Sequence, residues 1–509
     1  MSELHDVTIV TPTIGRPSLR LLLDAIAAGI EAGNPVPREI VLVDDRRATC
    51  RLDIEIPTAL APITRVVRGR ANGPAAARND GWRSTTTTWV AFLDDDVVPP
   101  PSWLADLAAD LETADAHGFS GTAGRIVVPL PRDRRPTDWE RNVAGLQRAH
   151  WATADMAYRR DALIEVAGFD ERFPRAYRED ADLALRVRRA GRRLTAGDRH
   201  IEHPARPASR IVSVKLQRGN VDDALMRALH GRDWAVAAEI FPGRRGAHAM
   251  TTAAGAAAVA LGVAGGTRLA RACGLAWLIA TARFAQQRIS AGPRDAREAA
   301  AMAATSVAIP PAALWWWAIG WWRARGAPPW PDRPVAVLLD RDGTLVKDVP
   351  YNGNPDLVAP TANAREALDT LRARGIRVGV VTNQSGVARG KLTQREVDAV
   401  NARIEELLGP IGAFHVCPHG ESDDCECRKP APGLIAAAAA SLGAHPRHCV
   451  VIGDIGSDVE AARNAGAQAI LVPTPQTRGS EVNAARHVAA DLHDAVRLAL
   501  RPGFIGSVR

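Results

Sequence analysis

The chain has 509 residues, 46% of them hydrophobic, which is enough for two to four domains of about 100–200 residues, each with a buried core. Its formal net charge is +7, from 64 Lys and Arg residues against 57 Asp and Glu residues. This balance fits either an Arg-rich composition or attraction to acidic lipids and phosphorylated substrates. No basic helix or aromatic-basic module stands out, which argues against a nucleic-acid-binding protein.

The start of the chain and its cysteines bear on the compartment. A short polar stretch runs directly into the apolar segment Val7–Val10, which is not the pattern of a secretory signal. The 6 cysteines are clustered, which is typical of metal binding in a reducing compartment rather than of a disulfide framework. We therefore expect a cytoplasmic protein, either free or at the inner face of the cell membrane.

Residues 1–205 alternate short apolar runs with helical patterns. The predicted buried strands are Val7–Val10, Glu39–Val43 and Trp89–Leu93, and the predicted helices are Ser18–Ala32 and Ser102–Glu112. Such alternation predicts a parallel α/β sheet.

Acidic residues follow these strands. Asp44 and Asp45 end the second strand, Asp94–Asp96 end the third, and Glu179 and Asp180 come later. Strand-end carboxylates suit a divalent metal that bridges the phosphates of a nucleotide diphosphate. A carboxylate on a separate element can deprotonate an acceptor hydroxyl. The alternatives are a solvated turn at Asp94–Asp96 and a helix start at Glu179 and Asp180.

The order of these elements, with Arg78 in a small-residue helix start, resembles the family 2 glycosyltransferases, which have the GT-A fold. The resemblance covers about 5–205. It implies a nucleotide-sugar donor, a glycan or lipid-linked acceptor, and Mg²⁺ or Mn²⁺ in the site. The implied donor and metal residues are Asp44 or Asp45, Arg78, Asp94 and Asp96, the implied base is Asp180 with Glu179 beside it, and His203 is either a late ligand or a surface residue.

Residues 206–325 differ from the preceding region in composition and pattern: they are rich in Ala, Gly, Arg and Trp and show no strand pattern. The apolar runs are Met250–Gly266, Cys273–Ala280 and Ala299–Trp322, the last with two Trp clusters. A membrane-spanning helix needs about 20 apolar residues and often carries an aromatic belt. The Trp clusters fit a belt, but Ala and Gly give little insertion drive. Membrane-inserted or interfacial helices and buried or amphipathic soluble helices both remain open.

A Pro-rich linker at 326–334 precedes a second predicted α/β domain at 335–500. Its first strand, Val335–Leu339, leads to Asp340 and Asp342 at the edge of the sheet where ligands bind. Asp340 would attack phosphorus, and Asp342 would protonate the leaving oxygen and then activate water. Mg²⁺ would neutralise charge between them. Taken alone, the pair fits a helix cap equally well.

Further strand ends strengthen the catalytic interpretation. A strand from Val378 ends in Thr382 and Asn383, a turn suited to a phosphate oxygen, and Arg428 and Lys429 supply positive charge. The apolar run at 450–453 leads to Asp454, which would complete the magnesium site, with Asp458 four residues on. Nucleophile pair, hydroxyl, lysine and acid, in this order after apolar strands, are hard to obtain by chance.

Four soft metal ligands lie between these elements, namely Cys417, His419, Cys425 and Cys427. Cys and neutral His are the usual zinc ligands, and four of them make a closed structural site. The spacing is not that of a zinc finger. It therefore indicates a loop clamped by zinc.

This region resembles the haloacid dehalogenase (HAD) superfamily, within it the group of D-glycero-D-manno-heptose 1,7-bisphosphate 7-phosphatases and histidinol-phosphatases, over about 333–500. The resemblance implies a Rossmann-like fold and a sugar phosphate substrate. The implied residues are Asp340 (nucleophile), Asp342 (acid/base), Thr382, Asn383, Arg428 and Lys429 (phosphate), Asp340, Asp342 and Asp454 (Mg²⁺), and Cys417, His419, Cys425 and Cys427 (Zn²⁺). The chain departs from the group in a short stretch after His419 and in Ile455, where a basic residue is expected.

The sequence thus predicts a bifunctional enzyme, with a GT-A domain and a HAD domain joined by a helical region. One alternative for the C-terminal half is a histidinol-phosphatase-like or other sugar-phosphate phosphatase. The alternative for the N-terminal half is a non-catalytic module that binds glycans or nucleotide sugars.

Overall fold

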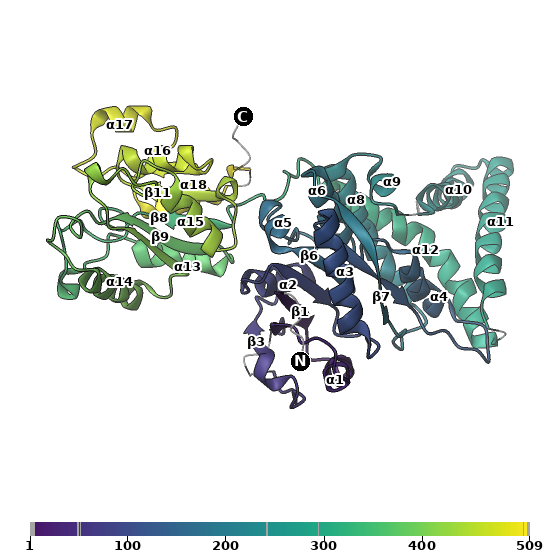
Figure 1. The fold of residues 1–509 in the computed structure, drawn as a ribbon. Coiled ribbons are helices and arrows are strands. Elements are labelled where there is room, and N and C mark those ends of the chain that lie inside the picture. Colours follow the sequence, from purple (N-terminus) through teal and green to yellow (C-terminus); the bar gives the residue numbers. More distant parts are fainter. Residues whose placement is uncertain are drawn as a thin grey trace. The chain divides into compact units, whose positions relative to one another are not determined.

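Two β-sheets flanked by helices organise the chain (Figure 1). The computed structural model describes residues 6–47, 50, 52–240, 243–293, 295–501 and 503–505. The chain forms two compact units, one made of Met1–Leu163 and Phe169–Ala327 and the other of Ile164–Gly168 and Pro328–Arg509. The predicted class of two α/β domains with a helical region between them is confirmed. The helical region falls within the first unit, and the finer domain bounds stay a prediction.

The N-terminal sheet has seven strands in the order β3-β2-β1-β4-β6-β5-β7. They are β1 (Val7–Thr13), β2 (Glu39–Asp44), β3 (Thr64–Arg68), β4 (Trp89–Leu93), β5 (Gly121–Val127), β6 (Asp155–Arg159) and β7 (Leu194–Glu202). The first four are parallel, as predicted. β6 runs antiparallel to β4 and β5, which the sequence did not reveal because apolar periodicity reports burial rather than strand direction.

Helices cover both faces of this sheet. The helices of the unit before residue 206 are α1 (Ser18–Glu31), α2 (Pro74–Arg83), α3 (Trp103–His117), α4 (Asp138–Ala144), α5 (Arg160–Glu165) and α6 (Glu179–Arg189). Apolar residues of α1 and α3 share one core with Val7, Ile9 and Ile40. α2 lies against the other face, where a Cβ on Gly81 would overlap the Val10 side chain and lie 2.9 Å from Val43. Glycine is thus what lets α2 approach the sheet.

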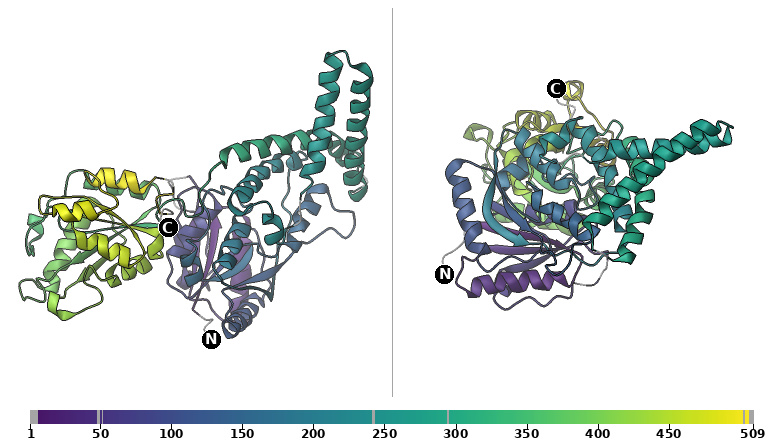
Figure 2. Two further views of the ribbon diagram at one scale, coloured as in Figure 1. Left: turned by 90° about the horizontal axis from the view of Figure 1, so that it is seen from above. Right: turned by 90° about the vertical axis from the view of Figure 1, so that its right-hand side faces the viewer.

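The middle region consists of helices and their connecting loops, with no strand among its described residues. Its helices are α7 (Val212–Lys215), α8 (Asn220–His230), α9 (Trp234–Ala237), α10 (Arg245–Val263), α11 (Thr267–Ala291) and α12 (Ala296–Arg323). α10 and α11 run side by side and extend away from the sheet of their own unit, whereas α12 packs along α8 (Figures 1 and 2). Two of these helices, α10 and α12, are long and apolar enough to cross a membrane.

The C-terminal sheet has five parallel strands in the order β10-β9-β8-β11-β12. They are β8 (Ala336–Leu339), β9 (Arg377–Asn383), β10 (Ala413–Cys417), β11 (Cys449–Gly453) and β12 (Gln468–Leu471). The helices of this unit are α13 (Ala364–Ala373), α14 (Gln394–Leu408), α15 (Gly433–Ser441), α16 (Gly456–Asn464), α17 (Gly479–Ala484) and α18 (Leu492–Ala499). Short 3₁₀ helices lie at Ala61–Ile63, Gly145–Arg148, Leu216–Gly219, Pro355–Leu357, Glu421–Asp423 and Pro446–His448.

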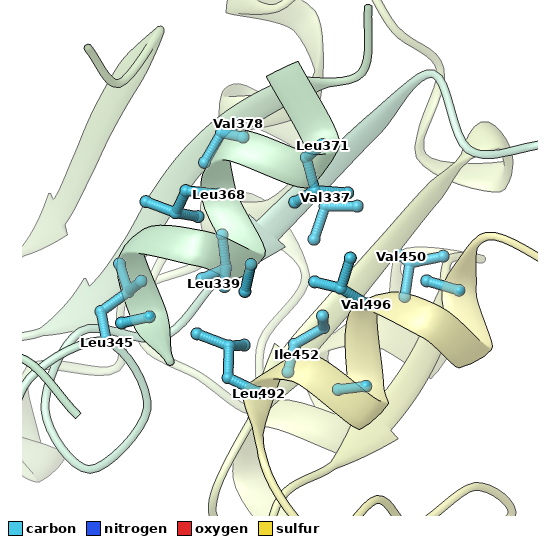
Figure 3. Packing of buried hydrophobic residues seen from close by; sticks show 14 of the residues in the cluster. Val337, Leu339, Leu345, Leu368, Leu371, Val378, Val450, Ile452, Leu492 and Val496 are labelled. Atoms are coloured by element: carbon cyan, nitrogen blue, oxygen red, sulfur yellow. The ribbon is translucent and has the colours of Figure 1, made fainter. Parts of the chain in front are cut away.

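Strand residues of this sheet alternate between two cores. Val337 and Leu339 face α13 and α18, where they meet Leu371 and Val496 (Figure 3). Leu338 faces the opposite side, toward α15 and α16. This period of two is the geometry of a β-strand, and each fully buried aliphatic side chain contributes about 1.5–3 kcal/mol. The two cores fix the strand ends that carry the site.

Replacing Gly81 tests the packing of α2. We expect Gly81→Ala to lower the free energy of unfolding of the N-terminal unit by about 1–3 kcal/mol, because the added methyl overpacks the α2–sheet contact. Gly246→Ala is the matched control, since a Cβ there meets no atom within 4 Å, and it should be neutral or slightly stabilising. Thermal and urea unfolding followed by circular dichroism measure both, and equal stability of the two variants would contradict the packing argument.

Candidate active sites

Three carboxylates meet at the carboxyl edge of the C-terminal sheet. Asp340 follows β8 and Asp454 follows β11, and these strands are parallel neighbours, so both side chains emerge at one edge. Asp458 lies in the first turn of α16. One oxygen from each carboxylate lies within 4.8 Å of the other two, and all three residues are buried.

Lys429 enters this group as a buried cation. Its ammonium donates to the Asp340 carboxylate, to Asp458 Oδ1 at 2.5 Å and to the Val381 carbonyl at 2.9 Å. Although burial opposes it, the Asp340 and Asp458 carboxylates raise the pKa of Lys429. Burial raises the pKa of Asp340 well above its usual value in spite of Lys429, and burial followed by the Asp458 charge raises that of Asp454 to about 6. Three carboxylates against one ammonium leave a negative excess that a hard cation with oxygen ligands would balance.

Asp342 faces a different set of partners. Its carboxylate accepts hydrogen bonds from Arg341 Nη2 and from Gln384 Nε2, both at 2.8 Å. Gln384 Nε2 also donates to Thr382 Oγ1 at 2.9 Å. Gln384 therefore joins the predicted acid/base to the predicted phosphate-binding hydroxyl. The group of three carboxylates contains Asp458, whereas the sequence had placed Asp342 with Asp340 and Asp454.

Gly343 explains why the turn after Asp342 can carry these groups. Its φ is +86°, in the region that favours glycine. A Cβ at this position would overlap the Asp454 carboxylate. The segment from Asp340 to Thr344 can therefore approach Asp454 only with glycine in the middle.

Two predicted phosphate binders have structural partners. Asn383 donates to the Lys429 carbonyl and accepts from the Lys429 amide, both at 3.1 Å, so it fixes the backbone of Lys429. Arg428 donates to the His419 carbonyl at 3.3 Å and lies 3.4 Å from Glu421. The structure thus places Arg428 against the Cys/His loop.

The four soft ligands lie together as the sequence spacing predicts. The sulfur atoms of Cys417, Cys425 and Cys427 are 3.3–3.7 Å apart, and His419 Nδ1 is 3.5 Å from Cys417 and 3.2 Å from Cys427. A tetrahedral zinc with bonds of about 2.3 Å to sulfur and 2.0–2.1 Å to nitrogen sets its ligands about 3.4–3.8 Å apart. The donor set and spacing fit zinc, and His415 on β10 stays outside the group.

The N-terminal unit contains a cavity of about 1000 Å³, large enough for a nucleotide sugar. It is lined by the predicted residues Asp45, Arg78, Asp94, Asp96, Glu179, Asp180 and His203. Asp44 is not among the lining residues, because its carboxylate is held by Arg46 at 2.8 Å and Arg68 at 2.9 Å. Asp45 accepts from the Gly73 amide at 2.9 Å beside the cavity. Of the two alternatives for the nucleotide, the geometry therefore favours Asp45.

Arg78 links the strand-end acids to α6. Its guanidinium, only 1% exposed, donates to Asp94 Oδ1 at 2.6 Å and to Glu179 Oε1 at 2.9 Å. Burial, and then the neighbouring Asp180 charge, raise the pKa of Glu179 to about 8. Burial likewise raises the pKa of Asp180, whose carboxylate accepts from the Ala181 amide at 2.7 Å. Asp180 is thus a carboxylate beside the cavity whose pKa lies above its usual value.

The remaining strand-end acids also meet cations. Asp95 accepts from Arg16 at 2.7 Å and from Thr13 at 2.8 Å. Asp96 lies 2.9 Å from Arg206 and 3.6 Å from His203 Nε2. A divalent metal on Asp96 would have to displace Arg206, so metal binding at this site stays a prediction.

Two family models match different ends of the chain. The one described as Glycosyl transferase family 2 covers residues 8–182, and the one described as HAD-hydrolase-like covers residues 426–495. The D-glycero-beta-D-manno-heptose-1,7-bisphosphate 7-phosphatase of Pseudomonas aeruginosa is 38% identical over 143 residues, which are 27% of this chain and 80% of that protein. The protein of the same name from Mesorhizobium japonicum is 35% identical over 164 residues, 30% of this chain and 76% of that protein.

The chain belongs to this phosphatase family. A solved structure, D,D-heptose 1,7-bisphosphate phosphatase from B. bronchiseptica complexed with magnesium and phosphate, is 29% identical, with a TM-score of 0.30 over 32% of this chain and 96% of that chain. The C-terminal unit is thus a HAD phosphatase domain, and the N-terminal unit contains a family 2 glycosyltransferase domain. The prediction of an enzyme of these two classes is confirmed.

Sequence reasoning left two residues of the phosphatase site without a role. Asp458 follows Asp454 by four residues, a spacing that puts two side chains on one face when a helix starts between them. Gln384 stands two residues after Thr382, in the turn that leaves β9. Both spacings are visible in the sequence, but neither shows which residue at the sheet edge each side chain contacts.

In the glycosyltransferase domain, the residues without a predicted role are the partners of the strand-end acids. Arg16 follows β1 and Arg206 follows β7, and each pairs with an acid after β4. Because these pairs join elements far apart in the sequence, no local pattern reveals them.

Proposed function

We propose that the protein is a bifunctional enzyme of carbohydrate metabolism. The phosphatase domain removes the 7-phosphate of D-glycero-D-manno-heptose 1,7-bisphosphate, and the glycosyltransferase domain moves a sugar from a nucleotide sugar to a glycan, lipid or natural-product acceptor. The observation that carries the first half is the buried group of Asp340, Asp454 and Asp458 around Lys429. The names of the relatives support heptose bisphosphate as the substrate.

The phosphatase residues are arranged for two successive displacements. A carboxylate oxygen of Asp340 attacks phosphorus, the bond from phosphorus to the sugar oxygen breaks, and that oxygen takes the proton of the Asp342 carboxyl. Asp342 then takes a proton from water, whose oxygen attacks the same phosphorus and releases inorganic phosphate and free Asp340. Gln384 orients Asp342 and leaves the Thr382 hydroxyl hydrogen free for a phosphate oxygen.

Asp340, Asp454 and Asp458 would hold Mg²⁺, since their oxygens converge and their charge exceeds that of Lys429. A bound Mg²⁺ supplies charge neutralisation between the carboxylates and the phosphoryl group. The Lys429 ammonium screens the negative charge of the Asp340 carboxylate from that of an approaching phosphate group.

Removing the nucleophile tests this assignment. We expect Asp340→Asn to lower phosphate release from heptose 1,7-bisphosphate by about 10³-fold or more, because an amide cannot form the acyl phosphate, while sugar transfer continues. Asp369→Asn is the control, because that carboxylate is 59% exposed on α13, and it should leave the rate unchanged. The measurement is phosphate release across sugar phosphates and histidinol phosphate. Full activity of Asp340→Asn refutes the mechanism. A preference for histidinol phosphate refutes the assignment of heptose bisphosphate as the substrate. Ile455, which is 39% exposed, is compatible with that second outcome.

We further propose that the Cys/His group binds structural zinc, on the strength of its four converging ligand atoms. Elemental analysis of freshly purified protein should find about one zinc per chain. Cys427→Ser should lose this zinc and lower the melting temperature of the phosphatase domain, whereas Cys273→Ser, in α11 of the other unit, should keep both. Protein without zinc but with full thermal stability would contradict the proposal.

For the N-terminal domain we propose Asp180 as the base. Its carboxylate takes the proton of the acceptor hydroxyl as that oxygen attacks the sugar and the diphosphate of the donor departs. The cavity that joins Asp180 to Asp45 supports this role. A non-catalytic module would have no need of such a group beside the cavity.

We also propose that α10 and α11 attach the protein to the cytoplasmic face of a membrane. α10 has none of its most apolar window buried, and Val259, Val263, Leu278 and Ile279 are 55–87% exposed. Residues 240–293 contain no Asp or Glu, and they contain the exposed arginines Arg268, Arg271 and Arg283, whereas Arg288 is buried and pairs with Asp138. Apolar faces flanked by arginines suit an anionic bilayer interface.

Cell fractionation tests this attachment. The protein should stay with membranes in a high-salt wash and leave them in detergent, because apolar burial is not screened by salt. Val259→Asp combined with Leu278→Asp should move it to the soluble fraction. Leu21→Asp, at a side chain 58% exposed on α1, should not. Release of the unaltered protein by salt alone would contradict embedding of the helices.

A further inference from the structure

The cavity of the glycosyltransferase domain has a second wall that the GT-A resemblance does not explain. Four basic side chains of the helical region line it, and we call them the basic wall: Lys215 on α7, Arg218 just after it, and Arg244 and Arg245 at the start of α10. The same cavity is lined on another side by the acids Asp94, Asp96 and Asp180. The basic wall and these acids therefore face one cavity.

The charges of the basic wall are largely uncompensated. In the described part of the chain, Lys215, Arg218 and Arg244 have no carboxylate at ion-pair distance. Arg245 lies 3.6 Å from Asp223 Oδ2, but Asp223 Oδ1 already accepts a 2.7 Å hydrogen bond from Arg178. Four cations thus share part of one carboxylate, whereas each of the acids after β4, Asp94, Asp95 and Asp96, has a cationic partner.

The guanidinium groups are positioned by neutral partners instead. Arg218 lies over the ring of Trp316 at 5.2 Å and Arg245 over that of Trp317 at 3.5 Å. Arg244 donates to the Gln287 side-chain carbonyl at 2.7 Å. Aromatic faces and amides orient an arginine without removing its charge. Buried Arg245 Nε has no hydrogen-bond partner among the described residues, and burial holds the pKa of Arg245 below its usual value.

The basic wall is coupled to the proposed base. Arg178 immediately precedes α6, whose second residue is Asp180, and its guanidinium reaches Asp223 on α8. Asp223 in turn meets Arg245. The wall therefore lies on the α6 side of the cavity, while Asp45 marks the side reached from β2. An anion at the wall would stand next to the acceptor's base rather than next to the nucleotide.

We propose that the basic wall binds a phosphate group of the acceptor, so that the acceptor is a phosphate ester whose reacting oxygen, a sugar hydroxyl or an oxygen of the phosphate itself, lies toward Asp180. Arginine and lysine without counter-charges are the side chains that recognise phosphate. This inference rests on the proposed sugar transfer and names its acceptor class. The phosphate has two possible sources, a soluble sugar phosphate or a lipid phosphate presented by the membrane beside α10.

Binding measurements on the full chain test this site. The Asp340→Asn background prevents hydrolysis of the probes, and phosphate bound in the phosphatase domain is common to all variants and cancels. The probes are a hexose 1-phosphate, farnesyl phosphate in detergent micelles and a nucleoside diphosphate, each followed by calorimetry. Lys215→Gln and Arg244→Gln should each weaken a phosphate ester about tenfold. They should change the affinity for the nucleoside diphosphate by no more than about twofold. Arg125→Gln is the control, since the Arg125 side chain is 69% exposed on β5 and does not line the cavity.

The outcomes separate the possibilities. Stronger binding of farnesyl phosphate supports a lipid acceptor, and stronger binding of the hexose phosphate supports a soluble one. An equal loss of affinity in Arg125→Gln, unchanged binding in both wall variants, or a parallel loss of affinity for the nucleoside diphosphate overturns the proposal. If no nucleotide sugar is turned over but the wall variants still bind phosphate esters more weakly, the transferase proposal fails and the phosphate site stands. Thermal melting checks folding, and Arg218→Gln replaces a variant that melts early.

Discussion

The buried ammonium of Lys429 is the interaction on which the phosphatase site depends. Burying a carboxylate without a partner is costly, and removing one member of a buried pair costs about 3–5 kcal/mol. Asp340 and Asp458 can therefore occupy one sheet edge because Lys429 bonds both. Asn383 fixes the Lys429 backbone from the end of β9, and Cys427 lies two residues before it. The Cys/His loop thus leads directly to this ammonium.

Arg78 plays the corresponding part in the glycosyltransferase domain. It joins Asp94, after β4, to Glu179, at the start of α6, and both Arg78 and Glu179 are buried. With Arg78 engaged by these two acids, Asp180 keeps a carboxylate with only a backbone donor. In each domain one cation binds two acids. In the glycosyltransferase domain, Asp180 stays outside the ion pairs of Arg78. In the phosphatase domain, a negative excess remains beside Lys429, which a hard cation would balance. The difference suits a proton acceptor in one domain and a phosphoryl-transfer centre in the other.

Sequence reasoning located these groups where local rules apply. Parallel strands bring their carboxyl ends to one edge, so Asp340 and Asp454 could be placed together before the structure was known. Ligand type and spacing likewise predicted that Cys417 and Cys427 lie together. Pairs between distant elements, such as Arg206 with Asp96, and the antiparallel direction of β6 depend on tertiary packing and leave no periodic trace. The sequence therefore predicted which residues meet at strand ends, but not which cation each acid keeps.

The net charge of +7 admitted two interpretations, and the position of the arginines weighs on the choice. An unselected Arg-rich composition would scatter acids among the arginines, as happens on α6, where Arg186 pairs with Asp182. Between residues 240 and 293 no acid accompanies the arginines. Some of them turn to the cavity, where Arg244 and Arg245 meet aromatic and amide partners, and others flank exposed apolar residues of α10 and α11. Apart from Arg288, which pairs with Asp138, these arginines are divided between the cavity and an apolar surface, which fits the phosphate-bearing acceptor and the membrane attachment that we propose.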